Sequence, residues 1–168
     1  MLTDCEQELV SQLFLLYCGR PADSAGLEYW CAQISLAAQS SSGGNRQSCQ
    51  DGSELPPGVI LFDAHTPVAG VDNKQDSLAL VDAFFRHALG RAATVRERAY
   101  IFAQSRRRGF TAIQLAFYFV NQLAGPDLSR YQMRLARARQ FTHEITTSGR
   151  PYKNENIEEA KVFLREKG

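Results

Sequence analysis

The sequence predicts one all-α domain over residues 1–168, a compact bundle of about six helices with a long loop insertion. Three observations predict this fold class. Apolar residues recur at helical spacing over most of the chain. Two Gly-Arg pairs, Gly19-Arg20 and Gly90-Arg91, each end such a stretch and are followed by a helix-capping residue. With 44% hydrophobic residues, including ten Phe and six Tyr, the chain can also fill a sizeable core.

The N-terminal pair of predicted helices recurs 71 residues later in the chain. We therefore expect a duplicated helix-pair unit, with unit one over about residues 3–36 and unit two over about 77–124. The alternative is two ordinary helix hairpins that share a Gly-Arg joint. The identical residues at this offset are Val10 and Val81, Phe14 and Phe85, Gly19 and Gly90, Arg20 and Arg91, Tyr29 and Tyr100, Ala32 and Ala103, and Gln33 and Gln104.

Each element of the first unit has its own start and stop signal. Thr3 and Glu6 have the spacing of a capping box at the start of the first helix. Gly19 is expected to take a positive φ just beyond its end, and Pro21 cannot continue it. Asp23 then caps a second helix by accepting a hydrogen bond from a free backbone N–H group.

The second unit repeats these signals and continues into a third helix. Gly90 ends its first helix, and Thr94 with Glu97 forms a capping box for the next. Thr111 and Gln114 have the same spacing before a helix that extends to about residue 123. Because that helix is apolar nearly all round, we expect it at the centre of the core.

Residues 37–76 differ in composition and are predicted to be an insertion loop. Residues 40–45 are rich in serine and glycine, and residues 52–58 are rich in turn-forming residues. An apolar run at 59–62 indicates an extended piece packed on the helices. Asp63 and His65 beside it are residue types that bind metals, but two ligands do not make a site, so a solvated turn is expected.

Two helices are predicted over the C-terminal residues 126–168. Gly125-Pro126 ends the preceding helix, and a long helix follows over about 128–146. The last helix carries apolar residues on one face, so it must dock on this core or on a partner. The inward residues expected of these two helices are Leu128, Tyr131, Leu135, Ala138, Phe141, Ile145, Ile157, Ala160, Phe163 and Leu164.

Residues 16–30 resemble the signature of the bacterial "domain of unknown function 4214" family. That signature has the form aromatic, apolar, Gly-Arg, Pro, Asp, two residues, Gly-Leu, one residue, Tyr-Trp. Residues 109–116 are similar to the family's continuation, and residues 84–91 are similar to a piece of phycobilisome linker domains. The motif residues are Gly19, Arg20, Asp23, Tyr29 and Trp30 in unit one, and Gly90, Arg91 and Thr94 in unit two.

The resemblance covers residues 9–35 well and 78–124 loosely. It implies a small helical module of surface-layer, secreted or assembly-linker proteins, and it implies no catalytic residues. Unit two departs from the motif, because the counterparts of its proline, second glycine and tryptophan are Ala92, Glu97 and Ile101. The helices tolerate these changes, whereas a surface function tied to the motif becomes doubtful in that unit.

The four cysteines are Cys5, Cys18, Cys31 and Cys49, and their spacing does not predict a metal site. Cys18 and Cys31 lie in apolar helical contexts, so we expect them to be small buried thiols. A bridge between Cys31 and Cys49, which would tie the loop to the second helix, is the alternative.

The charge is divided unevenly between the two halves of the chain. Residues 1–78 carry three basic and ten acidic groups, whereas residues 79–168 carry sixteen basic and eight acidic ones, so the halves have charges of −7 and +8. Such a split favours self-association or an anionic partner. The candidate partner-binding residues are Arg106, Arg107, Arg108, Arg130, Arg134 and Arg137. The alternative is a solvated helix face with ion pairs to the acidic half.

No motif for catalysis or phosphate binding occurs, so we expect neither an enzyme nor a cofactor. We expect no cleaved leader, because the N-terminus is acidic, and no membrane span, because the apolar runs are short. We therefore expect a cytoplasmic protein or one that is exported without a leader. The sequence favours a non-catalytic adaptor or assembly-linker module that binds another protein, with the terminal helix and the 37–76 loop as contact pieces. The alternative is binding of an anionic polymer, a nucleic acid or an acidic surface glycan, through the arginines.

Overall fold

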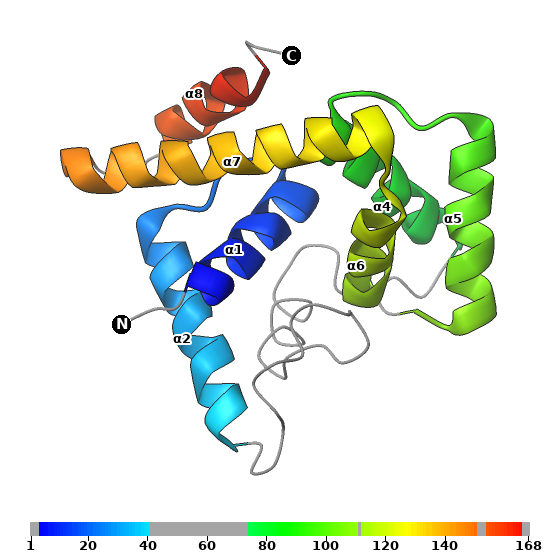
Figure 1. The fold of residues 1–168 in the computed structure, drawn as a ribbon, viewed down its shortest axis with the longest axis horizontal. Helices are drawn as coiled ribbons and strands as arrows, with labels where there is room; N and C mark the ends of the chain where they lie inside the picture. The colour runs from blue at the N-terminus through cyan, green and yellow to red at the C-terminus, as the bar shows by residue number, and fades with distance from the viewer. Residues whose placement is uncertain (1–3, 41–73, 111, 151–153, 166–168) are drawn as a thin grey trace.

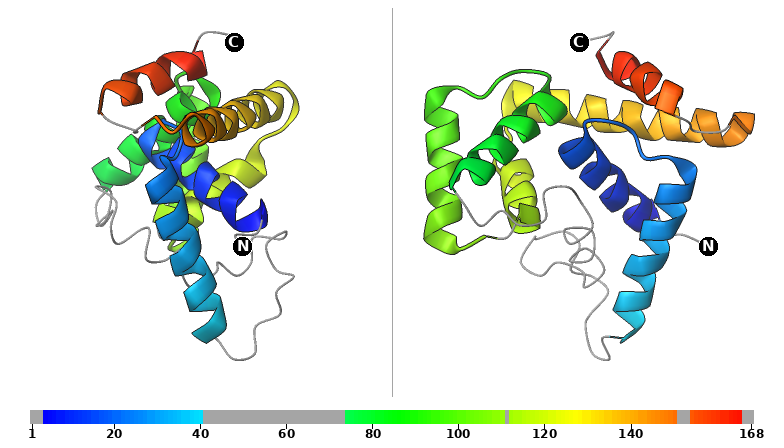
Figure 2. Two further views of the ribbon diagram at one scale, coloured as in Figure 1. Left: turned by 90° about the vertical axis from the view of Figure 1, so that its left-hand side faces the viewer. Right: turned by 180° about the vertical axis from the view of Figure 1, so that it is seen from behind.

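A long helix, α7 (Gly125–Ser148), lies across two groups of helices that come from the two halves of the chain (Figures 1 and 2). The structure is a computed structural model, and it describes residues 4–40, 74–110, 112–150 and 154–165. In Figure 1, α1 and α2 lie on one side below α7, and α4, α5 and α6 lie on the other.

The described residues form seven α-helices and two π-helical segments, and they contain no β-strand. The predicted all-α class is therefore confirmed, with one α-helix more than the six or so expected. In chain order the elements are α1 (Asp4–Leu13), η1 (Phe14–Cys18), α2 (Ser24–Ser40), α4 (Lys74–Phe84), η2 (Phe85–Leu89), α5 (Val95–Arg108), α6 (Ala112–Gln122), α7 (Gly125–Ser148) and α8 (Asn154–Arg165).

The predicted loop boundaries of 37 and 76 are wrong at both ends. Helix α2 continues to Ser40, because alanines and a glutamine at 37–39 favour a helix, and α4 already begins at Lys74. The rest of the insertion, with the apolar run at 59–62, lies outside the described residues.

Each helix pair turns at a π-helical segment that is followed by a glycine of positive φ. Gly19 has a φ of 62° and Gly90 a φ of 69°. Their N–H groups donate to the carbonyl oxygens of Leu15 and Arg86, each at 3.0 Å. The positive φ expected at Gly19 is therefore confirmed, and Gly90, which was expected to end its helix, has the same backbone conformation. The segments η1 and η2 have the same length and are 71 residues apart.

The predicted caps of α2 and α5 are also confirmed. The backbone N–H of Gly26 donates to Asp23 Oδ1 at 2.7 Å. At the other joint, the Glu97 N–H donates to Thr94 Oγ1 at 3.3 Å, and the Thr94 N–H donates to the Glu97 carboxylate at 2.8 Å. The capping boxes predicted at Thr3 and Thr111 lie outside the described residues.

The core lies where the two π-helical segments meet, so both halves of the chain contribute to it. Phe84 is fully buried there. Its ring stands edge-on to Tyr17, with the centroids 5.5 Å apart, and lies 5.7 Å from the ring of Phe119. The largest fully buried side chains are Phe84, Phe119, Leu13, Leu15, Leu16, Ile113, Leu115, Ile145, Leu164, Val10 and Val81.

Helix α6 is not at the centre of the core, contrary to the prediction. One side packs on α4 and buries Ile113, Leu115 and Phe119, whereas Phe117 and Tyr118 on the other side are only half-buried. The outer side can also carry aromatic residues, because a half-buried tyrosine places its ring against neighbours and its hydroxyl in water. Hydropathy alone does not distinguish that side from a buried one.

Helix α7 begins earlier than predicted, because Pro126 lies in its first turn, where a missing N–H costs nothing. Its predicted inward residues are buried except Leu128, which is half-buried. Helix α8 docks on α7: Ala160 and Leu164 are buried, and the ring of Phe163 lies 5.4 Å from that of Phe141. The apolar face of α8 is therefore covered by this chain.

Candidate functional site

The structure does not bring the six candidate arginines together. Arg106, Arg107 and Arg108 are exposed in the last turn of α5. The first turn of α5 lies near the start of α7, where Arg91 binds both Glu97 and Asp127. Because α5 has 14 residues, at a rise of about 1.5 Å each, its arginine cluster lies about 20 Å away along the helix.

The arginines of α7 are used differently from the prediction. Arg134 is half-buried, and its guanidinium donates to the carbonyl oxygens of His87 at 2.9 Å and Leu164 at 3.0 Å. It therefore ties η2 and α8 to α7. Arg130 is exposed and lies 3.7 Å from Asp127, and Arg137 is half-buried. These three side chains do not present one continuous arginine face.

Several other arginines form ion pairs, and the pair of Arg139 is of the kind that the alternative expected. Arg139 of α7 lies 3.4 Å from Glu8 and so links the basic half to the acidic half. Arg91 binds the carboxylates of Glu97 and Asp127, and its guanidinium lies over the ring of Phe85 at 5.0 Å. The hydrogen bond from Arg91 lowers the pKa of Glu97 to about 2. These contacts hold the start of α5 against the start of α7.

The last turn of α5 forms a surface with aromatic residues of α5, of α6 and of the segment between them. The Arg108 guanidinium lies over the ring of Tyr118 at 5.4 Å and over the ring of Phe110 at 5.8 Å. The Tyr118 hydroxyl donates to the hydroxyl of Tyr100 at 3.3 Å, and Tyr100 is half exposed, at 50%. We call this the arginine–tyrosine surface, made of Tyr100, Arg106, Arg107, Arg108, Phe110 and Tyr118.

The aromatic half of this surface was missed by the sequence analysis, which assigned the aromatics of this region to the core. A signal was present: Tyr100 and Arg108 are eight residues apart and so lie on the same side of α5. The surface is also strongly basic. From residue 92 to residue 126 the chain has five arginines and one acidic group, Glu97, for a net charge of +4.

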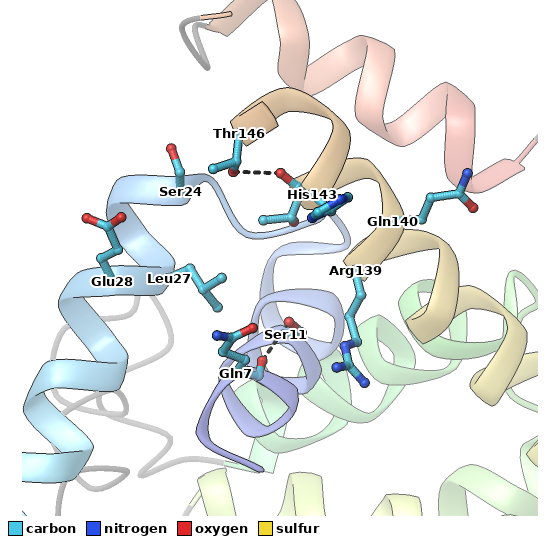
Figure 3. A pocket seen from close by; sticks show the side chains of 10 residues that line it. Gln7, Ser11, Ser24, Leu27, Glu28, Arg139, Gln140, His143 and Thr146 are labelled. Atoms are coloured by element: carbon cyan, nitrogen blue, oxygen red, sulfur yellow. Dashed lines mark hydrogen bonds between the residues drawn. The ribbon is translucent and has the colours of Figure 1, made fainter. Parts of the chain in front are cut away.

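A second feature is a polar cleft where α1, α2 and α7 meet (Figure 3). It has a volume of about 470 Å³, and the sequence did not predict it because its walls come from distant parts of the chain. Its lining residues are Gln7, Ser11, Ser24, Leu27, Glu28, Arg139, Gln140, Thr142, His143 and Thr146.

The other candidate groups give no further site among the described residues. No three His, Cys, Asp or Glu side chains in that part of the chain are grouped as a metal ion would require, and Asp63 and His65 lie outside it. Cys31 is buried, as expected, and Cys18 is half-buried. Cys49 lies outside the described residues, so the alternative, a bridge between Cys31 and Cys49, is not tested. No described helix is long and apolar enough to cross a membrane.

His87 lies where the two halves meet. Its Nδ1 is 2.8 Å from the carbonyl oxygen of Leu16, which can only accept, so Nδ1 carries the proton. Burial lowers the pKa of His87, and the positive charges of Arg86, Arg134 and Lys161 lower it further, whereas the Leu16 hydrogen bond opposes them. The ring is therefore held neutral between the two halves.

Acid should weaken the folded state through His87. The unfolded chain takes up this proton near pH 6.5 and the folded chain only at lower pH, so unfolding is favoured as the pH falls below about 6.5. The stability from the neutral ring is present above that pH. We expect the urea midpoint to fall more between pH 7.5 and 5.5 in the wild type than in His87→Gln. The exposed His143→Gln is the control and should behave as wild type; equal losses in all three proteins would contradict the assignment.

Comparison with models of known protein families, with curated proteins and with solved structures finds no match to this chain. The family resemblance expected from residues 16–30 thus stays a prediction, and the function must be argued from the chain's own surfaces.

Proposed function

We propose that this chain is a non-catalytic interaction module, an adaptor or assembly linker, whose arginine–tyrosine surface binds an acidic segment of another protein. One observation carries the proposal: the Arg108 guanidinium is held over two aromatic rings, beside the exposed Arg106 and Arg107. Arginine and tyrosine, together with tryptophan, are enriched among the residues that supply most of the binding energy at protein interfaces.

The chemistry of the surface suits carboxylates. A guanidinium donates two parallel hydrogen bonds to one carboxylate, and Arg108 is already oriented by Phe110 and Tyr118. A side chain that is ordered before binding loses less conformational entropy when the partner arrives. The Tyr100 hydroxyl, half exposed at the edge, adds a polar group that can bind the partner's backbone.

The alternative partner is a nucleic acid or an acidic glycan. The basic charge suits either, but bases bind by stacking on open aromatic faces. Here Arg108 covers one face of the Tyr118 ring and approaches that of Phe110. This arrangement favours charge and hydrogen-bond recognition over stacking, so the anionic polymer is kept as an outcome of the test.

We also propose that the two helix pairs are copies of one unit, as the residues repeated at an offset of 71 predict. In support, contacts of the two joints occur at matching positions. Arg20 lies over the ring of Phe14 at 5.2 Å, and Arg91 lies over the ring of Phe85 at 5.0 Å. Each of these arginines also donates to the carbonyl oxygen of the residue that follows it. The exposed Tyr29 and Tyr100 are a further matching pair.

The experiment compares two triple variants that remove the same charge. A fluorescein-labelled glutamate-rich peptide and a thymidine oligonucleotide of equal charge serve as probes in fluorescence polarisation. We expect Arg106→Ala/Arg107→Ala/Arg108→Ala to weaken peptide binding about tenfold or more. The control, Arg86→Ala/Arg130→Ala/Arg150→Ala, should change it less than about threefold, because those exposed arginines lie outside the surface.

Two outcomes would contradict the proposal. Equal losses in both triple variants would mean that only net charge matters. Tighter binding of the oligonucleotide, with affinity falling linearly in log salt concentration, would support the anionic polymer instead.

A further inference from the structure

We infer that His87 is a proton switch, which in mildly acidic solution releases the C-terminal helix α8 from α7 while the two halves of the chain stay joined. The switch consists of the contacts that η2 makes with η1, α7 and α8, and the arginine–tyrosine surface takes no part in it. Helix α8 lies along α7 at one edge of the molecule (Figures 1 and 2).

One side of the His87 ring is fixed against η1 and the turn that follows it. Nδ1–H donates to the carbonyl oxygen of Leu16 at 2.8 Å. A histidine that takes up a second proton gains it on the other ring nitrogen, so the hydrogen bond to Leu16 exists in both forms. The ring also lies closely against Gly19, where a Cβ would be 2.9 Å from Nε2. Protonation therefore leaves this link between the two halves intact.

Cations act on the same ring from three elements. They are Arg86 of η2 itself, Arg134 of α7 and Lys161 of α8. Segment η1 carries no charged side chain, and Asp82 of α4 is paired with Arg98 at 3.0 Å. A second proton on His87 thus places a positive charge near three others, and like charges repel one another.

The repulsion falls most when α8 leaves. Lys161 moves away with that helix, together with Glu158, which lies 2.7 Å from it and offsets part of its charge. Arg134 donates to the carbonyl oxygen of Leu164 at 3.0 Å, and undocking breaks that bond. Its guanidinium can then turn from the ring toward water. Arg86, in contrast, belongs to η2, whose neighbours Phe85 and Leu89 are buried in the core.

The packing of α8 also allows it to leave without the rest of the fold. Ala160 joins Phe141 and Ile145 of α7 in a small apolar cluster that is separate from the main core, and Phe163 packs against this cluster. Of the described residues of α8, Leu164 alone belongs to the main core. A helix with so few buried contacts opens at a lower free energy than the core helices. Its release exposes the apolar faces of both α7 and α8.

The pH range of the switch follows from the shift of the ring. Burial and the three cations hold the pKa of His87 below its ordinary value of 6.5 while α8 is docked. Undocking removes Lys161 and raises that pKa, so the undocked state binds more protons and acid favours it. Docking is therefore at full strength above about pH 6.5 and weakens below it, by at most about tenfold per pH unit because one proton is involved.

Hydrogen exchange of the full chain, followed by mass spectrometry at pH 7.5 and 5.5, tests the switch. After correction for the intrinsic exchange rates, we expect α8 to open more often than α4 and α6 at both pH values. The opening constant of α8 should rise about threefold to tenfold between pH 7.5 and 5.5. This rise should be absent in His87→Gln and unchanged in His143→Gln.

A second pair of variants separates the effect of the ring from that of charge on α8. Lys161→Gln removes the cation that leaves with the helix, so it should at least halve the rise. Arg150→Gln is the control: it removes an equal charge that pairs with Glu159 of α8 at 3.8 Å, and it should leave the rise unchanged. By NMR titration of the ring, the pKa of His87 should be higher in Lys161→Gln than in the wild type.

Three results would overturn the proton switch. Equal opening constants for α8, α4 and α6 would mean that α8 leaves only when the whole chain unfolds. A rise that persists in His87→Gln would assign the acid sensitivity to other groups. An unchanged pKa of His87 in Lys161→Gln would show that the ring does not sense whether α8 is docked.

Discussion

Replacing Phe84 by alanine is expected to lower the free energy of unfolding by about 3–5 kcal/mol. The side chain is fully buried and touches aromatic rings of both halves, Tyr17 from the first and Phe119 from the second. Its loss removes apolar area from the core and leaves a cavity that rigid rings cannot readily fill. Urea unfolding followed by circular dichroism measures the change.

The matched control is Phe117→Ala on the outer side of α6. That ring is only half-buried, so we expect a loss of about 1–2 kcal/mol. If the two variants were equally destabilised, the assignment of the core to the meeting point of η1 and η2 would be wrong.

Replacing Gly19 by alanine is expected to cost about 3 kcal/mol or more. A φ of 62° costs an alanine about 1–2 kcal/mol relative to glycine. In addition, a Cβ at Gly19 would lie 2.6 Å from Cδ2 of the His87 ring. That ring is held in place by the Leu16 carbonyl, so it cannot move away without losing its hydrogen bond. Urea unfolding again measures the loss.

Gly109 provides the control for backbone strain alone. Its φ is 64°, nearly that of Gly19, but a Cβ there would meet nothing within 4 Å. Gly109→Ala should therefore cost only about 1–2 kcal/mol. Adding His87→Ala to Gly19→Ala should recover part of the excess loss; no recovery would show that the His87 contact does not cause it.

The local signals in the sequence predicted the structure best. Glycines of positive φ and capping residues depend on neighbours three or four positions away, so Gly19, Gly90, Asp23 and Thr94 lie as expected. The buried side of α7 was also predictable from the sequence, because apolar residues at helical spacing lie on one side of a helix, and that side packs on the core.

Features that depend on distant partners were not predictable in the same way. Arg134 lies at the spacing of a surface arginine, yet it points to two carbonyl oxygens that come from residues 87 and 164. The polar cleft needs three helices that are far apart in the chain. The aromatic side chains beneath Arg108 have the hydropathy of core residues, and only the packing of α5 and α6 on α4 decides that they are half-buried near the surface.

The double contact of Arg134 makes the C-terminal helix sensitive to the middle of the molecule. One guanidinium binds the last turn of α8 through Leu164 and the π-helical turn η2 through His87. Any ligand or substitution that displaces η2 must therefore also change how firmly α8 is held, and by reciprocity the undocking of α8 must loosen η2. How firmly α8 is docked on α7 therefore depends on the structure of η2, where the two halves of the chain meet.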